Sequence, residues 1–364
     1  MKLKVSREEF QKKLSDIRGI VESRGALAIL THFLLVARKE GSLIQATNLE
    51  TYLREPLEAQ VEEEGSLCIP ARKMLELIRE VEGEVTLETE GETWLRVKAG
   101  SSKFRIACLS AADFPAWPSV QEVAKISVES KTLADMIEKT AFASGEDDKR
   151  YVLNGILFHL RPADKALVLV GTDGHRMSVS GRAISFTLKE EMKVVIPRKN
   201  VYELKKFLDT EGNVAVLFGK NHVVFMKGTV DFMTRLIEGS YPNYADIVPK
   251  NDKKVLLERE AFLRAVKRAS IMANGANAIK LAFAKGSVAV TSLTTDLGEA
   301  RDEVTAEYAG DDLALGLNSR YLLDALSIMG GEKIQLELGE PVSPLALRDS
   351  ADEGYLYVVM PMRL

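Results

Sequence analysis

The stretch VIPRKNVYELKKFLD, Val195–Asp209, decides the fold that we expect for this chain. A short apolar run ends in Pro197, and proline at such a position favours the start of a helix. At about 100° per residue, the helix has an apolar face and an opposite basic face. The apolar face carries Val201, Leu204, Phe207 and Leu208, and the basic face carries Arg198, Lys199, Lys205 and Lys206. One face therefore needs a core, and the other favours an anion.

The same pattern occurs twice more, as CIPARKMLELIREV at Cys68–Val81 and as GLNSRYLLDALSIM at Gly316–Met329. A second helical pattern begins at Arg7, Lys131 and Arg259, so its copies start 124 and 128 residues apart. Paired alternating segments, typical of antiparallel hairpins, close each copy. The repeat predicts three α+β domains, with boundaries near residues 122 and 250: 1–122, 123–250 and 251–364.

Composition excludes several classes of protein. The chain begins MKLKVSREEF, without the apolar core of a secretion signal, and it has no apolar run long enough to span a bilayer. Cys68 and Cys108 lie forty residues apart without a CxxC or a neighbouring His. This pattern favours a reducing cytoplasm and gives no sign of a disulfide framework, a metal site or a cofactor.

Charge is unevenly distributed along the chain. The six predicted helices carry nineteen Lys and Arg against twelve Asp and Glu, a net of +7 within a chain of net charge −4. A single helix of this kind is usually a solvated surface helix. The set, if its basic faces line a common surface, would contact phosphates by charge alone and without sequence preference.

No common catalytic or nucleotide-binding motif occurs in the chain. The stretch GTDGHRMSVSG, Gly171–Gly181, follows an apolar strand-like run. In an enzyme, Asp173 would orient His175 as a general base. Alternatively, Thr172, Asp173 and Gly174 form a local turn.

The chain ends in the apolar segment YLYVVMPMRL, Tyr355–Leu364. Such a terminus either packs into its own domain or leaves an adaptable pocket for the side chains of a partner. The sequence leaves both interpretations open.

Several segments together resemble the bacterial DNA polymerase III β subunit family, the sliding clamps. They are RYVLNGILF at Arg150–Phe158, TDGHRM at Thr172–Met177, VIPRK at Val195–Lys199, the Tyr241–Tyr244 segment with Pro249–Lys250, and the terminal YVVMPMRL. LSAADFP at Leu109–Pro115 and Arg24 match more weakly. Most of the resemblance covers the second and third predicted domains.

The resemblance implies three repeated domains of the DNA clamp fold, each with antiparallel sheets and two inner helices, in a head-to-tail homodimer ring around duplex DNA. It implies a non-catalytic processivity factor that works without a cofactor. The implied partners are the polymerase III catalytic subunit, the clamp loader, other polymerases, and repair and replication-initiation control proteins. They would bind through short motifs in a pocket between domains 2 and 3, formed by Leu153, Thr172, Gly174, His175, Arg176, Met177, Pro242, Ile247, Val342, Val358, Met360, Pro361 and Met362.

Two further sets of residues are implied. The DNA-facing set is Arg24, Arg72, Lys73, Arg198, Lys199, Lys205, Lys206, Arg264, Lys267 and Arg268. The dimer-interface set is Ile78, Arg96, Lys103, Arg105, Ile106, Ile271, Met272, Glu299 and Asp302. Asp147 stands where the family would have a polar DNA-facing residue, so we expect less DNA contact from its loop. The alternatives are a hydrolase or transferase that uses Asp173 and His175, and a purely structural repeat protein.

Overall fold

The computed structural model describes residues 1–208, 211–273, 275–294 and 298–363. Asp209, the last residue of the opening stretch, and Leu364, the last of the apolar tail, lie outside the described residues. The chain packs into two compact units, residues 1–131 with 203–236 and residues 132–202 with 237–364.

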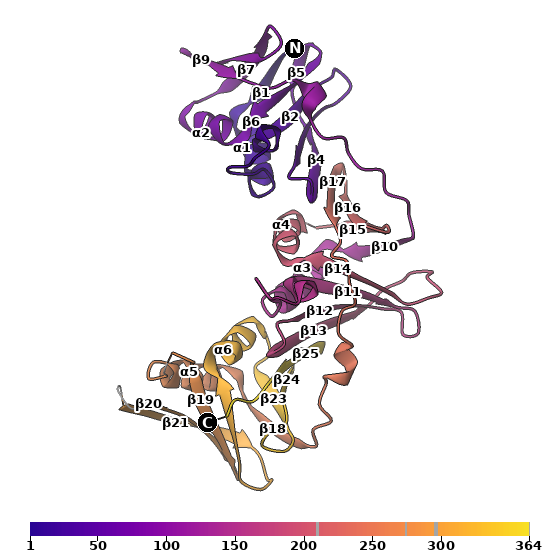
Figure 1. Ribbon diagram of the computed structural model, residues 1–364. Coiled ribbons are helices and arrows are strands. Elements are labelled where there is room, and N and C mark those ends of the chain that lie inside the picture. The colour runs from indigo at the N-terminus through magenta and orange to yellow at the C-terminus, as the bar shows by residue number, and fades with distance from the viewer. Residues whose placement is uncertain (209–210, 274, 295–297, 364) are drawn as a thin grey trace. The chain divides into compact units, whose positions relative to one another are not determined.

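The order of elements repeats three times along the chain: a strand, a helix, four strands, a second helix and three strands (Figure 1). One extra strand, β5, belongs to the first run. The first run is β1 (Lys2–Ser6), α1 (Arg7–Asp16), β2 (His32–Ala37), β3 (Ser42–Thr47), β4 (Thr51–Leu57), β5 (Gln60–Glu63), β6 (Gly65–Pro70), α2 (Ala71–Glu80), β7 (Glu84–Glu90), β8 (Trp94–Ala99) and β9 (Ser102–Ala107).

The second and third runs follow the same order. The second is β10 (Ala124–Glu129), α3 (Ser130–Ala141), β11 (Gly155–Arg161), β12 (Ala166–Thr172), β13 (Arg176–Ala183), β14 (Met192–Pro197), α4 (Arg198–Leu208), β15 (Asn213–Phe218), β16 (His222–Lys227) and β17 (Val230–Arg235). The third is β18 (Lys253–Glu258), α5 (Arg259–Ser270), β19 (Ala278–Ala284), β20 (Ser287–Thr294), β21 (Gly298–Glu307), β22 (Leu313–Asn318), α6 (Ser319–Ile328), β23 (Lys333–Leu338), β24 (Leu345–Asp349) and β25 (Asp352–Val359). The three-domain α+β fold with antiparallel sheets is confirmed.

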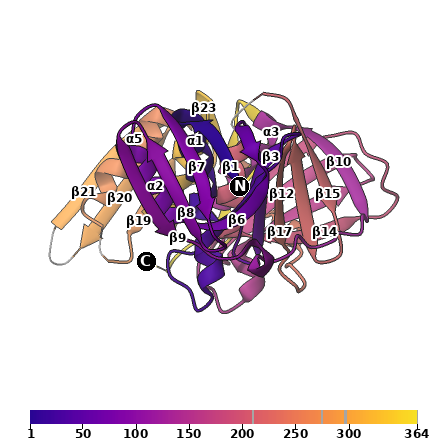
Figure 2. The same ribbon diagram turned by 90° about the horizontal axis from the view of Figure 1, so that it is seen from above.

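The first unit contains a five-stranded sheet of order β5-β1-β7-β8-β9, of which Figure 2 labels β1, β7, β8 and β9. It also contains an eight-stranded sheet of order β10-β15-β16-β17-β4-β3-β2-β6. In the larger sheet, β17 of the second run pairs antiparallel with β4 of the first. We call this pairing the first junction. It joins two successive repeats through backbone hydrogen bonds.

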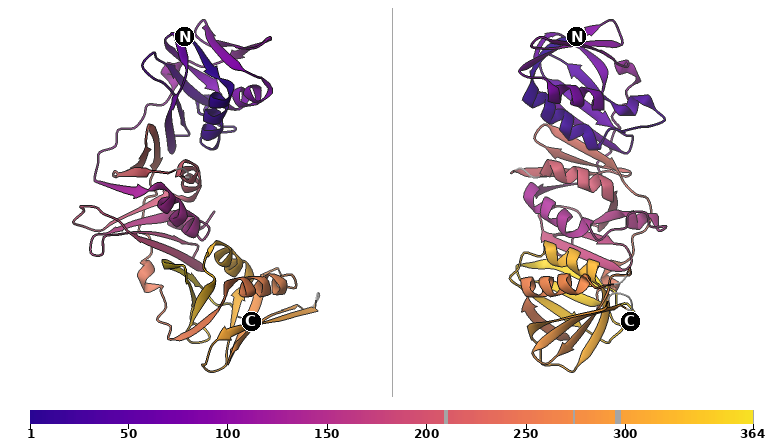
Figure 3. Two further views of the ribbon diagram at one scale, coloured as in Figure 1. Left: turned by 180° about the vertical axis from the view of Figure 1, so that it is seen from behind. Right: turned by 90° about the vertical axis from the view of Figure 1, so that its left-hand side faces the viewer.

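The second unit contains one twelve-stranded arrangement of order β14-β11-β12-β13-β25-β24-β23-β18-β21-β20-β19-β22. Here β25 of the third run pairs antiparallel with β13 of the second. We call this pairing the second junction. The helices α5 and α6 of this unit lie side by side (Figure 3).

Local sequence explains where the helices begin and end. Ser6 caps α1 through a 3.2 Å hydrogen bond from the Glu9 backbone N–H, and Pro197 immediately precedes α4. The predicted helix α4 is confirmed, and Val201, Leu204 and Leu208 on its apolar face are buried. The first helix of the pattern that begins at Arg7 is short, because α1 ends at Asp16 and only a short 3-10 turn, Ile17–Gly19, follows.

No helix in the described ranges is both long enough and apolar enough to cross a bilayer. Cys68 and Cys108 are free and buried. Burial raises the pKa of each thiol to about 12.

Candidate functional site

The TDGHR segment forms a turn between β12 and β13 in the second unit. Asp173 Oδ1 accepts hydrogen bonds from the backbone N–H groups of His175, at 2.9 Å, and Arg176, at 3.0 Å. Gly174 has a φ of +85°, a conformation that glycine adopts without steric cost. The prediction of a local turn is therefore confirmed. The enzyme alternative is wrong on one point, because the Asp173 carboxylate holds the backbone N–H of His175 and not its imidazole.

The Arg176 guanidinium is held both by the turn and by α6, and its Nε donates to Asp173 Oδ2 at 3.0 Å. Its Nη1 donates to Asp324 of α6 at 2.6 Å and its Nη2 to the Phe142 carbonyl at 3.0 Å, and the guanidinium lies 4.5 Å from the centre of the Tyr321 ring. Burial alone would lower the pKa of Arg176, but Tyr357, Asp324 and Asp173 raise it overall. This side chain is therefore a permanently charged support of the second junction.

The predicted apolar pocket residues fall into a buried set and a more accessible set. Leu153, Met177 and Val358 are each 1 % exposed. Met177 and Val358 are directly paired across β13 and β25, and both belong to one apolar cluster. Met177 and Val358 therefore form a rigid part of the predicted pocket, because close packing holds fully buried side chains in place.

The more accessible set includes Met360, Met362 and Val342. Met360 is fixed by its backbone N–H, which donates to the His175 carbonyl at 2.9 Å, while its side chain remains 39 % exposed. The Met362 N–H donates to the Gly316 carbonyl at 2.7 Å. The apolar tail is thus tied to its own unit by its backbone, while the Met360 side chain remains accessible. Val342 is 84 % exposed.

The segment that carries Pro242 and Ile247 packs on the same unit. The Tyr241 hydroxyl donates to the Val170 carbonyl at 3.2 Å, and the Tyr244 hydroxyl lies 2.8 Å from His159 Nδ1. Burial raises the pKa of Tyr241 and lowers that of His159. These contacts hold the segment against β11 and β12.

Sequence reasoning missed three residues that the structure relates to the site. Tyr321 and Asp324 of α6 contact the Arg176 guanidinium, and Tyr151 is a large exposed side chain beside Arg150 of the matching RYVLNG segment. The signal for α6 was weak, because a helix with one basic residue, Arg320, resembles an ordinary surface helix.

Four of the predicted DNA-facing residues form ion pairs within their own helices. Arg72, Lys73, Lys206 and Arg264 pair with glutamates of their own helices, at 3.0, 2.9, 2.6 and 3.0 Å. Exposed pairs of this kind contribute about 0–1 kcal/mol and exchange easily with solvent or another anion. The basic faces therefore remain available to a polyanion.

The predicted interface residues differ in accessibility. Ile271 is 74 % exposed, whereas Ile106, on β9 at the end of its sheet, is 8 % exposed. Ile78 is fully buried in its own domain and has no surface left for a partner, so its assignment is corrected. Phe104, which the sequence analysis did not single out, is 37 % exposed on the same strand.

The predicted charge pairs of the interface have partners within the chain. Arg105 Nε lies 3.0 Å from Glu90, Arg96 lies 3.4 Å from the same carboxylate, and Asp302 bonds to Arg268. Lys103 and Glu299 are exposed. If Arg96, Arg105 or Asp302 paired across an interface, the new partner would have to replace Glu90 or Arg268.

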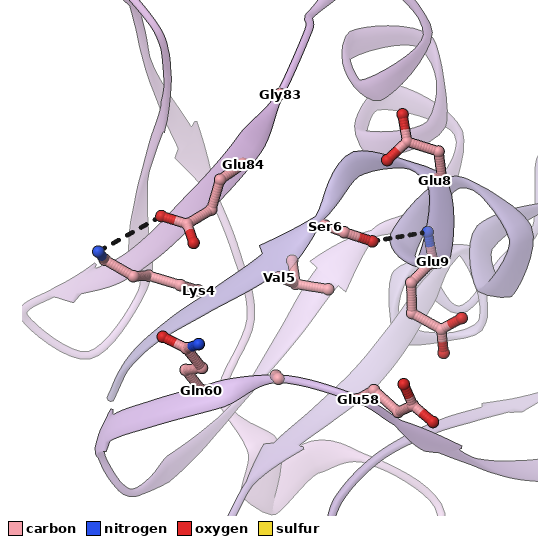
Figure 4. A pocket seen from close by; sticks show the side chains of 10 residues that line it. Lys4, Val5, Ser6, Glu8, Glu9, Glu58, Gln60, Gly83 and Glu84 are labelled. Carbon is pink, nitrogen blue, oxygen red and sulfur yellow. Dashed lines mark hydrogen bonds and ion pairs between the residues drawn. The ribbon is translucent and has the colours of Figure 1, made fainter.

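A separate groove of about 610 Å³ in the first unit lies between β1, β5 and the start of α1 (Figure 4). Its acids are Glu8, Glu9, Glu58 and Glu84, and Lys4 pairs with Glu84 at 3.3 Å. Across the described residues, no group of three or more His, Cys, Asp and Glu could hold a metal ion.

Comparisons with known proteins agree along the whole chain. Models of the DNA polymerase III beta subunit match in three parts: the N-terminal domain at residues 1–118, the central domain at 127–243 and the C-terminal domain at 245–363. The beta sliding clamps of Pseudomonas putida and Escherichia coli K12 are each 33% identical to the chain, over 100% of both chains.

Solved structures give the same result. The DNA polymerase III subunit beta of Pseudomonas aeruginosa has a TM-score of 0.94 at 31% identity, and a sliding clamp from Bartonella birtlesii, bound to griselimycin, has 0.96 at 31%, both over 100% of each chain. From these matches and the repeated fold, we conclude that the chain belongs to the DNA polymerase III beta subunit family, the bacterial sliding clamps.

Proposed function

We propose that this protein is the processivity factor of DNA polymerase III: two copies close head to tail into a ring around duplex DNA and tether the polymerase to it. The protein performs no chemical step and needs no cofactor. It acts in the cytoplasm, on DNA of any sequence. The three domains are residues 1–122, 123–250 and 251–364, a division that the three matched segments support.

The observation that carries this proposal is that successive repeats join by the same strand pairing. At both junctions, the last strand of one repeat pairs with the fourth strand of the repeat before it, as β17 does with β4 and β25 with β13. The corresponding last strand of the first repeat, β9, ends its sheet. The fourth strand of the third repeat is β21, and in the described pairings it meets β18 only through Ala306 and Glu307.

If the same strand pairing also joins two copies of the chain, it predicts the interface between them. If β9 of one copy pairs with β21 of the next, the contact is head to tail, and two such contacts close a ring. Pairing also covers an exposed strand edge. Phe104 and Ile106 of β9 and Ile271 after α5 would then supply the apolar contact.

The second-unit pocket is the docking site for short linear motifs in this proposal. Its buried residues, Met177 and Val358, and its exposed residues, Met360 and Val342, suit aromatic or aliphatic anchors, which carry most of the affinity in such contacts. The partners are the polymerase III catalytic subunit, the clamp loader, other polymerases, and repair and replication-initiation control proteins.

The ring is tested by retention on DNA. After loading onto a nicked circle, the protein should stay bound at high salt and leave when the same DNA is linearised, because the link is topological. Native mass gives an independent measure, since one chain weighs 40.2 kDa and the ring needs two. Equal loss from circular and linear DNA would contradict the proposal.

The pocket is tested by removing the chain from Pro361 onward. Binding of a polymerase-derived peptide should be lost while the protein remains dimeric, because the deletion takes away part of the pocket and leaves β9 and β21 intact. Fluorescence anisotropy measures the affinity. Unchanged peptide binding would show that the site lies elsewhere.

A further inference from the structure

A cleft of about 590 Å³ in the second unit lies beside α6, the helix that carries only one basic residue. Its walls come from α6, from the segment that follows α3 and from the start of α4. Arg176 is part of the lining, but it already pairs with both Asp173 and Asp324, so these three side chains together carry a net charge of −1. The charge that a ligand could use must therefore come from other side chains.

Two other arginines line the same cleft, Arg320 from α6 and Arg198 from α4. Arg320 is exposed, and its guanidinium makes no hydrogen bond or ion pair with any residue that the structure describes. Two consecutive repeats thus bring one arginine each to one cleft. Guanidinium groups suit a tetrahedral oxyanion, because their planar N–H donors can bind two oxygens at once.

Arg198 is only weakly engaged. It lies 3.4 Å from the carboxylate of Glu146, whose side chain is 86 % exposed, and 3.5 Å from the Ser144 carbonyl. Its guanidinium also lies 5.6 Å from the centre of the Tyr202 ring, which restricts its position. An ion pair whose acid is so exposed is easily exchanged for another anion.

We propose that this cleft binds one backbone phosphate of duplex DNA between Arg198 and Arg320, and that Glu146 competes with the phosphate for Arg198. The inference rests on the proposed function, which brings duplex DNA to the helices. It assigns a defined contact to α6, whose basic content is otherwise low. It also gives the acidic segment after α3 a role, as an internal competitor of the DNA backbone.

The test measures equilibrium binding of the full chain to a labelled duplex over a range of salt concentrations. Arg198→Ala and Arg320→Ala should each weaken binding about three- to tenfold and lower the slope of log affinity against log salt by about 0.9, since each removes one phosphate contact. Lys254→Ala, on the exposed side of β18, is the matched control for a lost positive charge and should leave both quantities unchanged.

Glu146→Gln should raise affinity about twofold or more, because it frees Arg198 for the phosphate. Asp147→Asn removes the same charge from the next residue and should have a smaller effect. The decisive comparison is a double-mutant cycle, in which Glu146→Gln has no further effect once Arg198 is alanine.

The outcomes separate this inference from the proposed function. If the unaltered protein is not retained on circular DNA, the proposed function fails. If it is retained but both arginine variants match Lys254→Ala, the phosphate site is overturned. If Glu146→Gln raises affinity equally with and without Arg198, the competition is overturned.

Discussion

The two junctions are built on the same backbone, although their sequences differ. In the first junction, Asn48 Oδ1 accepts hydrogen bonds from the backbone N–H groups of Glu50, at 3.1 Å, and Thr51, at 2.7 Å, as Asp173 does in the second. The residue in the middle of each turn has a positive φ, +72° at Leu49 and +85° at Gly174. TNLET and TDGHR are therefore the same turn in two repeats.

The equivalence extends to the strands that pair at each junction, β17 at the first and β25 at the second. The Arg235 N–H donates to the Glu50 carbonyl at 2.8 Å, as the Met360 N–H does to the His175 carbonyl at 2.9 Å. Side chains at equivalent positions are nevertheless different. The pairs are Leu49 and Gly174, Glu50 and His175, Tyr52 and Met177, and Arg235 and Met360.

These differences between equivalent side chains determine what covers each junction. In the first, Tyr52 makes an edge contact with Trp117 at 5.8 Å between ring centres, and the Arg54 guanidinium lies 4.7 Å from the Trp117 ring. The chain's own linker therefore covers this junction. In the second, Met177 is buried, while Met360, at the position of Arg235, is 39 % exposed. One backbone motif thus carries an aromatic cover at the first junction and exposed apolar side chains at the second.

The largest contrast that we predict concerns the arginine at each junction. Arg176→Ala should cost about 3 kcal/mol of local stability, because Arg176 is 11 % exposed and its loss leaves two half-buried carboxylates unpaired. Arg54→Ala should cost about 1 kcal/mol or less, since Arg54 is 40 % exposed beside Asp231. Hydrogen exchange of β25 and β17 amides measures the two costs. Equal costs would remove the energetic distinction between the junctions.

A second test addresses the ion pairs behind the second junction. Asp352 accepts from Lys139 at 2.7 Å and from Arg182 at 2.6 Å. Asp352→Asn should cost about 2 kcal/mol at neutral pH, because it weakens two charge-assisted hydrogen bonds. Asp231→Asn, at the more exposed pair of the first junction, should cost less than about 1 kcal/mol.

The cost of Asp352→Asn should depend on pH. Burial opposes the ionised form, but Lys139 and Arg182 hold the pKa of Asp352 below its ordinary value. A lowered carboxyl pKa stabilises the folded state above the ordinary pKa, and that stabilisation is lost as pH falls through the folded-state value. As pH falls, the difference in local stability between the variant and the unaltered protein should therefore shrink, and hydrogen exchange of the β25 amides measures it. A constant difference would show that Asp352 acts by packing alone.

A third test exchanges the side chains at one equivalent position. Met360→Arg should weaken binding of a polymerase-derived peptide about tenfold, equal to about 1.4 kcal/mol, because it replaces an apolar contact with a solvated charge. Arg235→Met should leave peptide affinity unchanged. A comparable loss from both variants would mean that the peptide does not distinguish the junctions.

The sequence predicted the repeats well because helices with an apolar and a basic face have a period that is easily read. It did not predict how the repeats join. Strand pairing between β17 and β4, or between β25 and β13, depends on segments far apart in the chain, and alternation of apolar residues does not identify the partner strand.

The candidate site was predicted mainly from resemblance, and its physical organisation was not. TDGHRM suggested a turn, but the direction of the Arg176 guanidinium depends on Asp324, which lies in another repeat. Ile78 was assigned to the interface by resemblance, and the sequence does not show whether an apolar residue on a helix is exposed or buried. The equivalence of TNLET with TDGHR was hidden, because Leu49 replaces the glycine that a positive φ usually requires.

That replacement gives the smallest effect and the most direct test of the equivalence. Leu49 is 42 % exposed, so its side chain gains little from burial, while a left-handed conformation costs a residue with a Cβ about 1–2 kcal/mol. Glycine removes this cost but adds about 0.5–1 kcal/mol of chain entropy, so Leu49→Gly should stabilise the first junction by about 0.5 kcal/mol. Gly174→Leu should destabilise the second by about 1 kcal/mol, since a Cβ there would lie 2.6 Å from the Arg150 guanidinium. Hydrogen exchange of β4 and β13 measures both changes, and effects of the same sign would mean that the two turns are not interchangeable.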